Sequence, residues 1–163
     1  MATLLEDIKT SSEWLTSKFE SEGLKLDYTI RSLIYIDTLF NIGVKDGKPI
    51  KNGAFAKDLG SMIFTIGAYT GQTIIKTVPG SVWVTDDNDP NGEITAAIKL
   101  PDETIMWPMQ RVMKRFKNGS EDSIYNYGHY ITKDYTNEPF DESYWNIDKG
   151  DHHPTSKPWW KIW

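Results

Sequence analysis

Three carboxylates lie close together in the sequence, between two apolar stretches, and are the first residues that could bind a ligand or take part in a reaction. Asp86, Asp87 and Asp89 could bind a divalent cation through their side-chain oxygens. A calcium loop of the EF-hand type, however, needs a glycine at its sixth position and a glutamate at its twelfth. Counted from Asp86, these positions hold Asn91 and Ala97. We therefore expect a solvated hairpin turn, since Asp, Asn and Gly are typical turn residues.

The histidines and hydroxyl residues do not form a recognisable catalytic or metal-binding pattern. His152 and His153 are adjacent, and adjacent side chains of a strand point to opposite faces. His129 lacks a second histidine four residues away, because Tyr125 and Lys133 occupy those positions. No serine stands in a G-x-S-x-G turn, and the chain has no cysteine. The sequence predicts no metal, no cofactor and no catalytic residue, which favours a non-enzymatic protein.

Length and charge restrict the classes of protein to consider. The chain has 163 residues, enough for one domain with its own core. Its 18 basic and 23 acidic residues give a formal net charge of -5, which disfavours nucleic acid as a partner. The first seven residues do not read as a secretory signal, and no apolar run is long enough for a membrane span. We expect a cytoplasmic protein, unless a leader has been removed.

A helix expected over residues 55–77 carries an unusual number of small residues. Gly60, Gly67 and Gly71 interrupt its apolar stripe, and each glycine inside a helix costs about 1 kcal/mol relative to alanine. Close approach of a strand or a second helix is the simplest explanation for all three.

The remaining periodicity predicts an α+β fold: helices, then a small antiparallel sheet of two to four strands, then helices and an aromatic tail. The amino-terminal segment is either one long helix or a frayed turn followed by a helix that ends at Gly23. Residues 1–135 form one domain, and the tail, 136–163, packs on it. The other expected elements are helices at 27–43, 55–77, 108–118 and 124–131, and strands at 82–84, 94–100 and 104–107.

The aromatic tail allows two interpretations. Its rings could form a binding surface, because tryptophan and tyrosine are common interface anchors. They could instead be buried against the sheet, since large exposed apolar patches are rare. We favour burial for most of the five rings concerned, which are Tyr144, Trp145, Trp159, Trp160 and Trp163.

Residues Leu59 to Ile124 resemble a family of small, functionally uncharacterised bacterial α+β domains. The resemblance rests on an ordered set of motifs: Leu59-Gly60, Gly67-Ala68-Tyr69-Thr70-Gly71-Gln72, Trp83, the strand 97–100, Pro108, Lys114-Arg115 and the segment 118–124. In that family the helix motif is L-G-x-Y-x-G-E and a tryptophan-centred strand follows it. Gln72 stands here where relatives often have a glutamate, so any acid or base role at that position is lost. The resemblance implies a cytosolic protein that is sometimes encoded near toxin and immunity genes.

The leading hypothesis is a non-enzymatic protein-binding module, an immunity protein that neutralises a partner toxin. An acidic surface would favour a basic toxin as partner. The expected partner-binding residues are Asp86, Asp87, Asp89, Glu121, Asp122, Tyr144 and Trp145. The alternative is a small-ligand-binding protein or an enzyme with a pocket between the glycine-bearing helix and the sheet. The polar lining of that pocket would be Tyr69, Gln72, Trp83, Arg111 and Arg115.

Overall fold

The computed structural model describes residues 1–149, and its first element is one continuous helix. Helix α1 (Leu4–Glu20) begins at a capping box in which Thr3 and Glu6 each accept a hydrogen bond from the other's backbone N–H. The chain leaves the helix through Gly23, whose φ of 78° suits glycine. The polar stretch in the middle of α1 therefore does not interrupt the helix.

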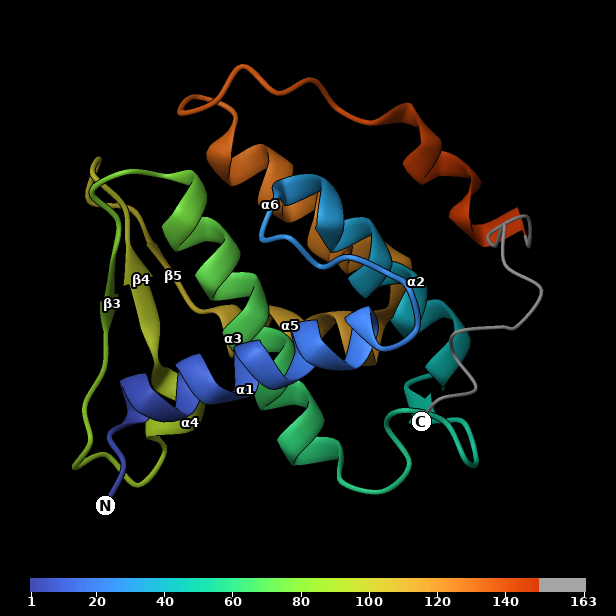
Figure 1. Cartoon of the computed structure of the whole chain (residues 1–163), viewed down its shortest axis with the longest axis horizontal. Helices are drawn as coiled ribbons and strands as arrows, with labels where there is room; N and C mark the ends of the chain where they lie inside the picture. Colours follow the sequence, from blue (N-terminus) through green and yellow to red (C-terminus); the bar gives the residue numbers. More distant parts are fainter. Residues whose placement is uncertain (150–163) are drawn as a thin grey trace.

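Helix α3 (Leu59–Thr77) lies at the centre of the fold, with α1 and α5 (Pro108–Asn118) packed against it (Figure 1). It starts four residues later than the sequence pattern predicts, because Asp58 accepts a hydrogen bond from the Ser61 N–H and caps it. Helix α5 begins at Pro108, as expected for a proline in the first helical position.

A second group of helices covers the other side of the core. The 3₁₀ turn η1 (Ile30–Ser32) leads into α2 (Leu33–Gly43), which packs beside α6 (Ile124–Thr132). A two-residue hairpin, β1 (Val44–Lys45) and β2 (Lys48–Pro49), follows α2, and η2 (Gly119–Asp122) joins α5 to α6. Ser123 caps α6 by accepting a hydrogen bond from the Asn126 N–H.

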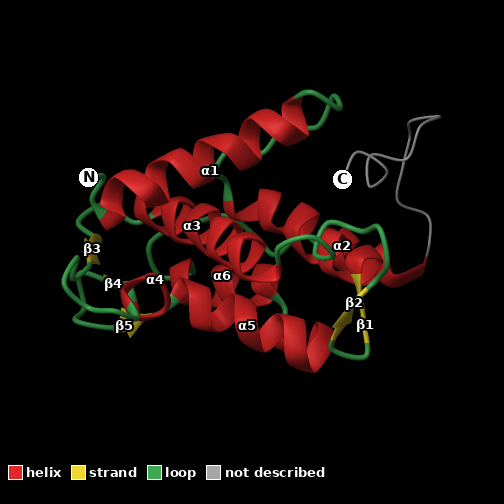
Figure 2. Cartoon of the chain, turned by 90° about the horizontal axis from the view of Figure 1, so that it is seen from below, coloured by secondary structure: helices red, strands yellow, loops and turns green. Residues whose placement is uncertain are grey.

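The main sheet stands at one end of the molecule, beside α3 (Figures 1 and 2). Its order is β3 (Val82–Val84), β4 (Ala97–Lys99) and β5 (Ile105–Met106), and both pairings are antiparallel. A one-turn helix, α4 (Gly92–Thr95), lies in the connection from β3 to β4. The fold is α+β, as the sequence predicts.

The beginning of the aromatic tail packs on α6 and α2. Phe140 and Tyr144 lie against Tyr125, with ring centroids 5.0 and 5.3 Å away, and η3 (Glu142–Lys149) contacts α2. The predictions for Trp159, Trp160 and Trp163 concern positions outside the described residues.

Candidate functional site

The inner face of the main sheet is filled by a tryptophan where the sequence suggested a pocket. The Trp83 indole packs directly over Gly71, and a Cβ at that glycine would overlap the ring. The indole Nε1 donates a 2.8 Å hydrogen bond to Gln72 Oε1. Gly67, one turn earlier in α3, allows the same close approach to Met109 of α5. Close packing therefore explains Gly67 and Gly71, whereas the position of a Cβ at Gly60 has only Asp58 nearby, 3.8 Å away.

The other residues expected to line that pocket serve separate parts of the core. Tyr69 is fully buried; its hydroxyl accepts a 3.0 Å hydrogen bond from the Tyr28 N–H and lies 2.6 Å from Ser32 Oγ. Burial raises the pKa of Tyr69 to about 12. Arg111 pairs with Asp122 at 3.1 Å. Of the five predicted lining residues, the structure joins Gln72 and Trp83 alone by a hydrogen bond within the described residues.

The strongest buried polar cluster centres on Asp37, which the sequence analysis did not identify. The Asp37 carboxylate accepts hydrogen bonds from Arg115 Nε at 2.8 Å and Ser123 Oγ at 2.8 Å. It also accepts the backbone N–H groups of Ile124 and Tyr125. Asp37 therefore ties α2 to the start of α6 and neutralises the buried Arg115. The one sequence signal was a single carboxylate in the apolar run of residues 33–40.

The acidic turn between β3 and α4 has local structural roles, as turn chemistry predicts. Asp86 accepts from the Asn88 N–H and Asp87 accepts from the Leu4 N–H at 2.7 Å, which attaches the start of α1. The Thr95 hydroxyl and the Asn91 N–H donate to Asp89 and lower its pKa. Asp86 and Asp87 remain exposed.

The other predicted partner-binding residues do not gather on this turn. Glu121 and Asp122 lie in η2, which packs against α5 and α2, and Asp122 pairs with Arg111 of α5. Tyr144 is only 6% exposed, because it packs into the core, so it is not a surface anchor. Trp145 is 57% exposed.

The outer face of the main sheet carries apolar side chains that nothing in the described residues covers. We use "outer face" for the exposed side chains of Val82, Val84, Ile105 and Trp107, together with Lys99 of β4, which is the strand partner of both Val82 and Ile105. The first three are 51%, 49% and 37% exposed, and Trp107, two residues beyond Ile105, is 44% exposed. Figures 1 and 2 place the sheet at the edge of the molecule, with the helices on its other side.

Acidic turns flank the outer face at both ends. Asp86 and Asp87 follow β3 at one end, and Asp102 and Glu103 lie in the turn from β4 to β5 at the other. The Thr104 hydroxyl and N–H donate to Asp102 and lower its pKa. Glu103 pairs with Lys99 of β4 at 2.6 Å. The face therefore presents apolar side chains around one paired lysine, with an acidic turn at each end.

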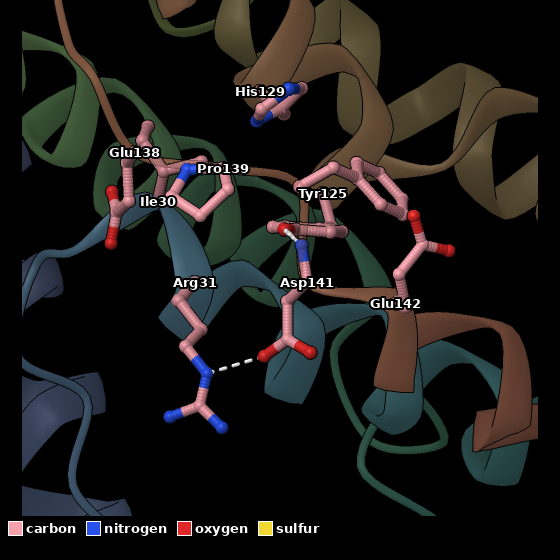
Figure 3. Close-up of a pocket in the computed structure, with 9 residues that line it drawn as sticks. Ile30, Arg31, Tyr125, His129, Glu138, Pro139, Asp141 and Glu142 are labelled. Carbon is pink, nitrogen blue, oxygen red and sulfur yellow. Dashed lines mark hydrogen bonds and ion pairs between the residues drawn. The ribbon is translucent and has the colours of Figure 1, made fainter.

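A hollow of about 370 Å³ beside α6 holds a second group of titratable side chains (Figure 3). Arg31 Nε donates to Asp141 at 2.5 Å, which lowers the pKa of Asp141, and the Asp141 N–H donates to the Tyr125 hydroxyl. These bonds attach the segment 138–142 to η1 and α6. His129 packs edge-on to Phe140, with ring centroids 5.3 Å apart. The polar contacts here hold the tail in place.

The described residues contain neither a cluster of metal ligands nor a helix that could span a membrane. No three His, Asp or Glu side chains of the described part are grouped to hold a metal ion. No described helix is both long and apolar enough to cross a membrane. No family model, no curated protein and no solved structure matches the chain, so the family resemblance stays a prediction.

Proposed function

We propose that this chain is a non-enzymatic protein-binding module that holds a basic protein against the outer face of its main sheet. The observation that supports the proposal is the largely apolar outer face between two acidic turns, in which the single lysine, Lys99, is paired with Glu103. Protein interfaces commonly have an apolar centre with a polar rim, and aromatic side chains such as Trp107 are frequent anchors. The partner that fits has a complementary apolar patch with lysine or arginine on two sides.

Charge supports a basic partner beyond the immediate contacts. The formal net charge is -5, and the charged turns lie next to the apolar surface. Opposite charge on a partner raises the encounter rate more than it strengthens the final complex. Fast capture is the property that an inhibitor of a toxin needs, so we propose that the module is a cytoplasmic immunity protein whose partner is a basic toxin.

The first test is affinity capture from the cells that make the protein, with three matched baits. These are the natural chain, a Val82→Asp/Val84→Asp variant of the outer face, and a Tyr130→Asp variant of α6. Tyr130 is 67% exposed and lies outside the outer face, so it controls for a new surface charge. We expect a basic protein on the first and third baits and its loss from the second. Melting curves of all three baits confirm that each is folded.

The second test concerns the immunity role. Cells that express the captured partner alone should stop growing, and co-expression of the natural chain should restore growth, whereas the Val82→Asp/Val84→Asp variant should not. If the same proteins bind all three baits, the outer face is not the binding surface. Turnover of a small metabolite by the purified chain, without any captured protein, would favour an enzyme instead.

A further inference from the structure

A groove between α3 and α5, closed at one end by α4, forms a second apolar surface that shares no residue with the outer face. Its volume is about 350 Å³, which is at the lower end of the range for ligand pockets. Ile94 is 43% exposed in it. The apolar side chains that line it are Leu59, Ile63, Phe64, Ile94, Met109, Met113 and Phe116.

The glycines of α3 explain why the groove is open. At Gly67 the two helices touch, since a Cβ there would lie 2.8 Å from Met109 Cγ. Two turns earlier, a Cβ at Gly60 would meet nothing nearer than its own helix cap at 3.8 Å. Helices α3 and α5 are therefore in close contact at one point and leave room for another element beside Gly60. The two methionines of α5 can adapt to the shape of an occupant.

The charges at the groove are opposite in sign. Glu93 of α4 lies at the end next to Met109, and Lys117 lies at the other, eight residues and about 12 Å further along α5. Neither side chain takes part in an ion pair within the described part of the chain. The acidic turn 86–89 precedes α4 and adds negative charge at the Glu93 end.

We propose that this groove binds a short apolar helix of a partner protein, with the amino-terminal end of that helix at Glu93 and its carboxyl-terminal end at Lys117. About 12 Å corresponds to two helical turns. The partial positive charge of a helix amino terminus suits Glu93, and the partial negative charge of its carboxyl terminus suits Lys117. A single-headed lipid would match one of these charges alone. Large apolar side chains three and four residues apart would enter the groove.

The test uses two lactam-bridged helical peptides of twelve residues with the same apolar stripe. The forward peptide has lysine in its first turn and glutamate in its last, and the reversed peptide has these charges exchanged. Fluorescence anisotropy with the full chain should show roughly tenfold tighter binding of the forward peptide. A Glu93→Lys/Lys117→Glu variant should prefer the reversed peptide. Non-specific hydrophobic binding of the peptides would not produce this exchange of preference.

A second variant tests the place of binding without disturbing the fold. Gly60→Phe adds a ring at an exposed position with free space around its Cβ, so it should fill the groove, leave the melting temperature unchanged or higher, and abolish binding of both peptides. Gly60→Ala, which adds only a methyl group, should retain binding. The proposal is overturned if neither peptide binds, if the charge exchange leaves the preference unchanged, or if Gly60→Phe binds normally. It is also overturned if the chain forms a dimer that Gly60→Phe dissociates, because a second copy would then occupy the groove.

Discussion

Side chains along the strands β3, β4 and β5 point alternately to the two faces of the sheet. One face is buried against the helices and the other is exposed. On the inner face, Trp83 packs over Gly71 and hydrogen-bonds Gln72, and Ile98 and Met106 are almost completely buried. On the outer face, about half of the surface of Val82 and of Val84 is accessible to solvent. Helix α3 packs against the inner side chains, whereas no described helix or sheet covers the outer side chains.

Because of this difference, neighbouring residues of one strand serve different purposes: one contributes to folding stability and the next is available for binding. A residue that points towards α3 contributes to the free energy of folding, because its removal leaves a cavity or an unpaired polar group. The next residue along the strand points to solvent, and its apolar side chain brings little stability. Substitutions on the inner face should therefore change mainly stability, and substitutions on the outer face should change mainly binding.

The largest expected effect is the loss of the inner tryptophan. Trp83→Ala should lower the free energy of unfolding by about 3 kcal/mol, because it empties the space over Gly71. Val84→Ala, one residue away on the outer face, should cost less than about 1 kcal/mol. Urea denaturation measures both values. Equal losses would mean that the two faces are packed alike.

Alkaline pH should weaken the packing of η1 on α3 through Tyr69. Its folded-state pKa of about 12 lies above the ordinary value of 10.0, so the unfolded chain releases this proton first. The stability that it contributes is present below pH 10 and should be lost as the pH rises towards 12, by about 2 kcal/mol. Chemical denaturation of the natural chain and of Tyr69→Phe at several pH values measures this. The loss attributable to residue 69 should be missing from the Phe variant.

Comparing alanine substitutions at two glycines of α3 distinguishes the effect of close packing from that of helix propensity. Gly71→Ala should cost about 1–3 kcal/mol, because the added methyl group overlaps the Trp83 ring. Gly60→Ala meets open space and should stabilise the chain by up to about 1 kcal/mol. Thermal unfolding measures both, and a stabilising Gly71→Ala would show that the indole can move away easily.

The smallest stability change is expected on the outer face. Val82→Thr/Val84→Thr keeps the β-branched shape and adds hydroxyl groups to exposed positions, so unfolding should shift by about 0.5 kcal/mol or less. Binding of the captured partner should nevertheless weaken at least tenfold, because the apolar centre of the interface becomes polar. A variant that binds normally would remove the outer face from the interface.

The fold class and several local features could be predicted from the sequence because they depend on short-range signals. Pro108 marks the start of α5, Asp86 and its neighbours form a turn, and Gly67 and Gly71 indicate close packing. What lies against those glycines depends on contacts between distant segments. The periodicity of 82–84 does not reveal that the Trp83 ring fills the expected pocket.

Polar partners were harder to predict for the same reason. Asp37 and Arg115 are 78 residues apart, and Asp87 and Leu4 are 83 apart. The sequence makes Arg115 a candidate ligand-binding residue, but in the structure it pairs with the buried Asp37 carboxylate. Asp87 and Asp89 looked like free surface charges, yet both hold local structure, so charge changes at those two positions also disturb the fold.

The most direct test of the proposed binding surface compares two exposed carboxylates of equal charge. Asp86 borders the outer face, whereas Glu121 lies in η2, which packs against α5 and α2. Association rates of the captured partner should be measured by stopped flow as the ionic strength rises from 0.01 to 0.15 M, over which the Debye length falls from about 30 to 8 Å. We predict that Asp86→Asn slows association and flattens its salt dependence, and that Glu121→Gln changes both much less. Equal effects of the two substitutions, or no effect of Asp86→Asn, would contradict a basic partner docked on the outer face.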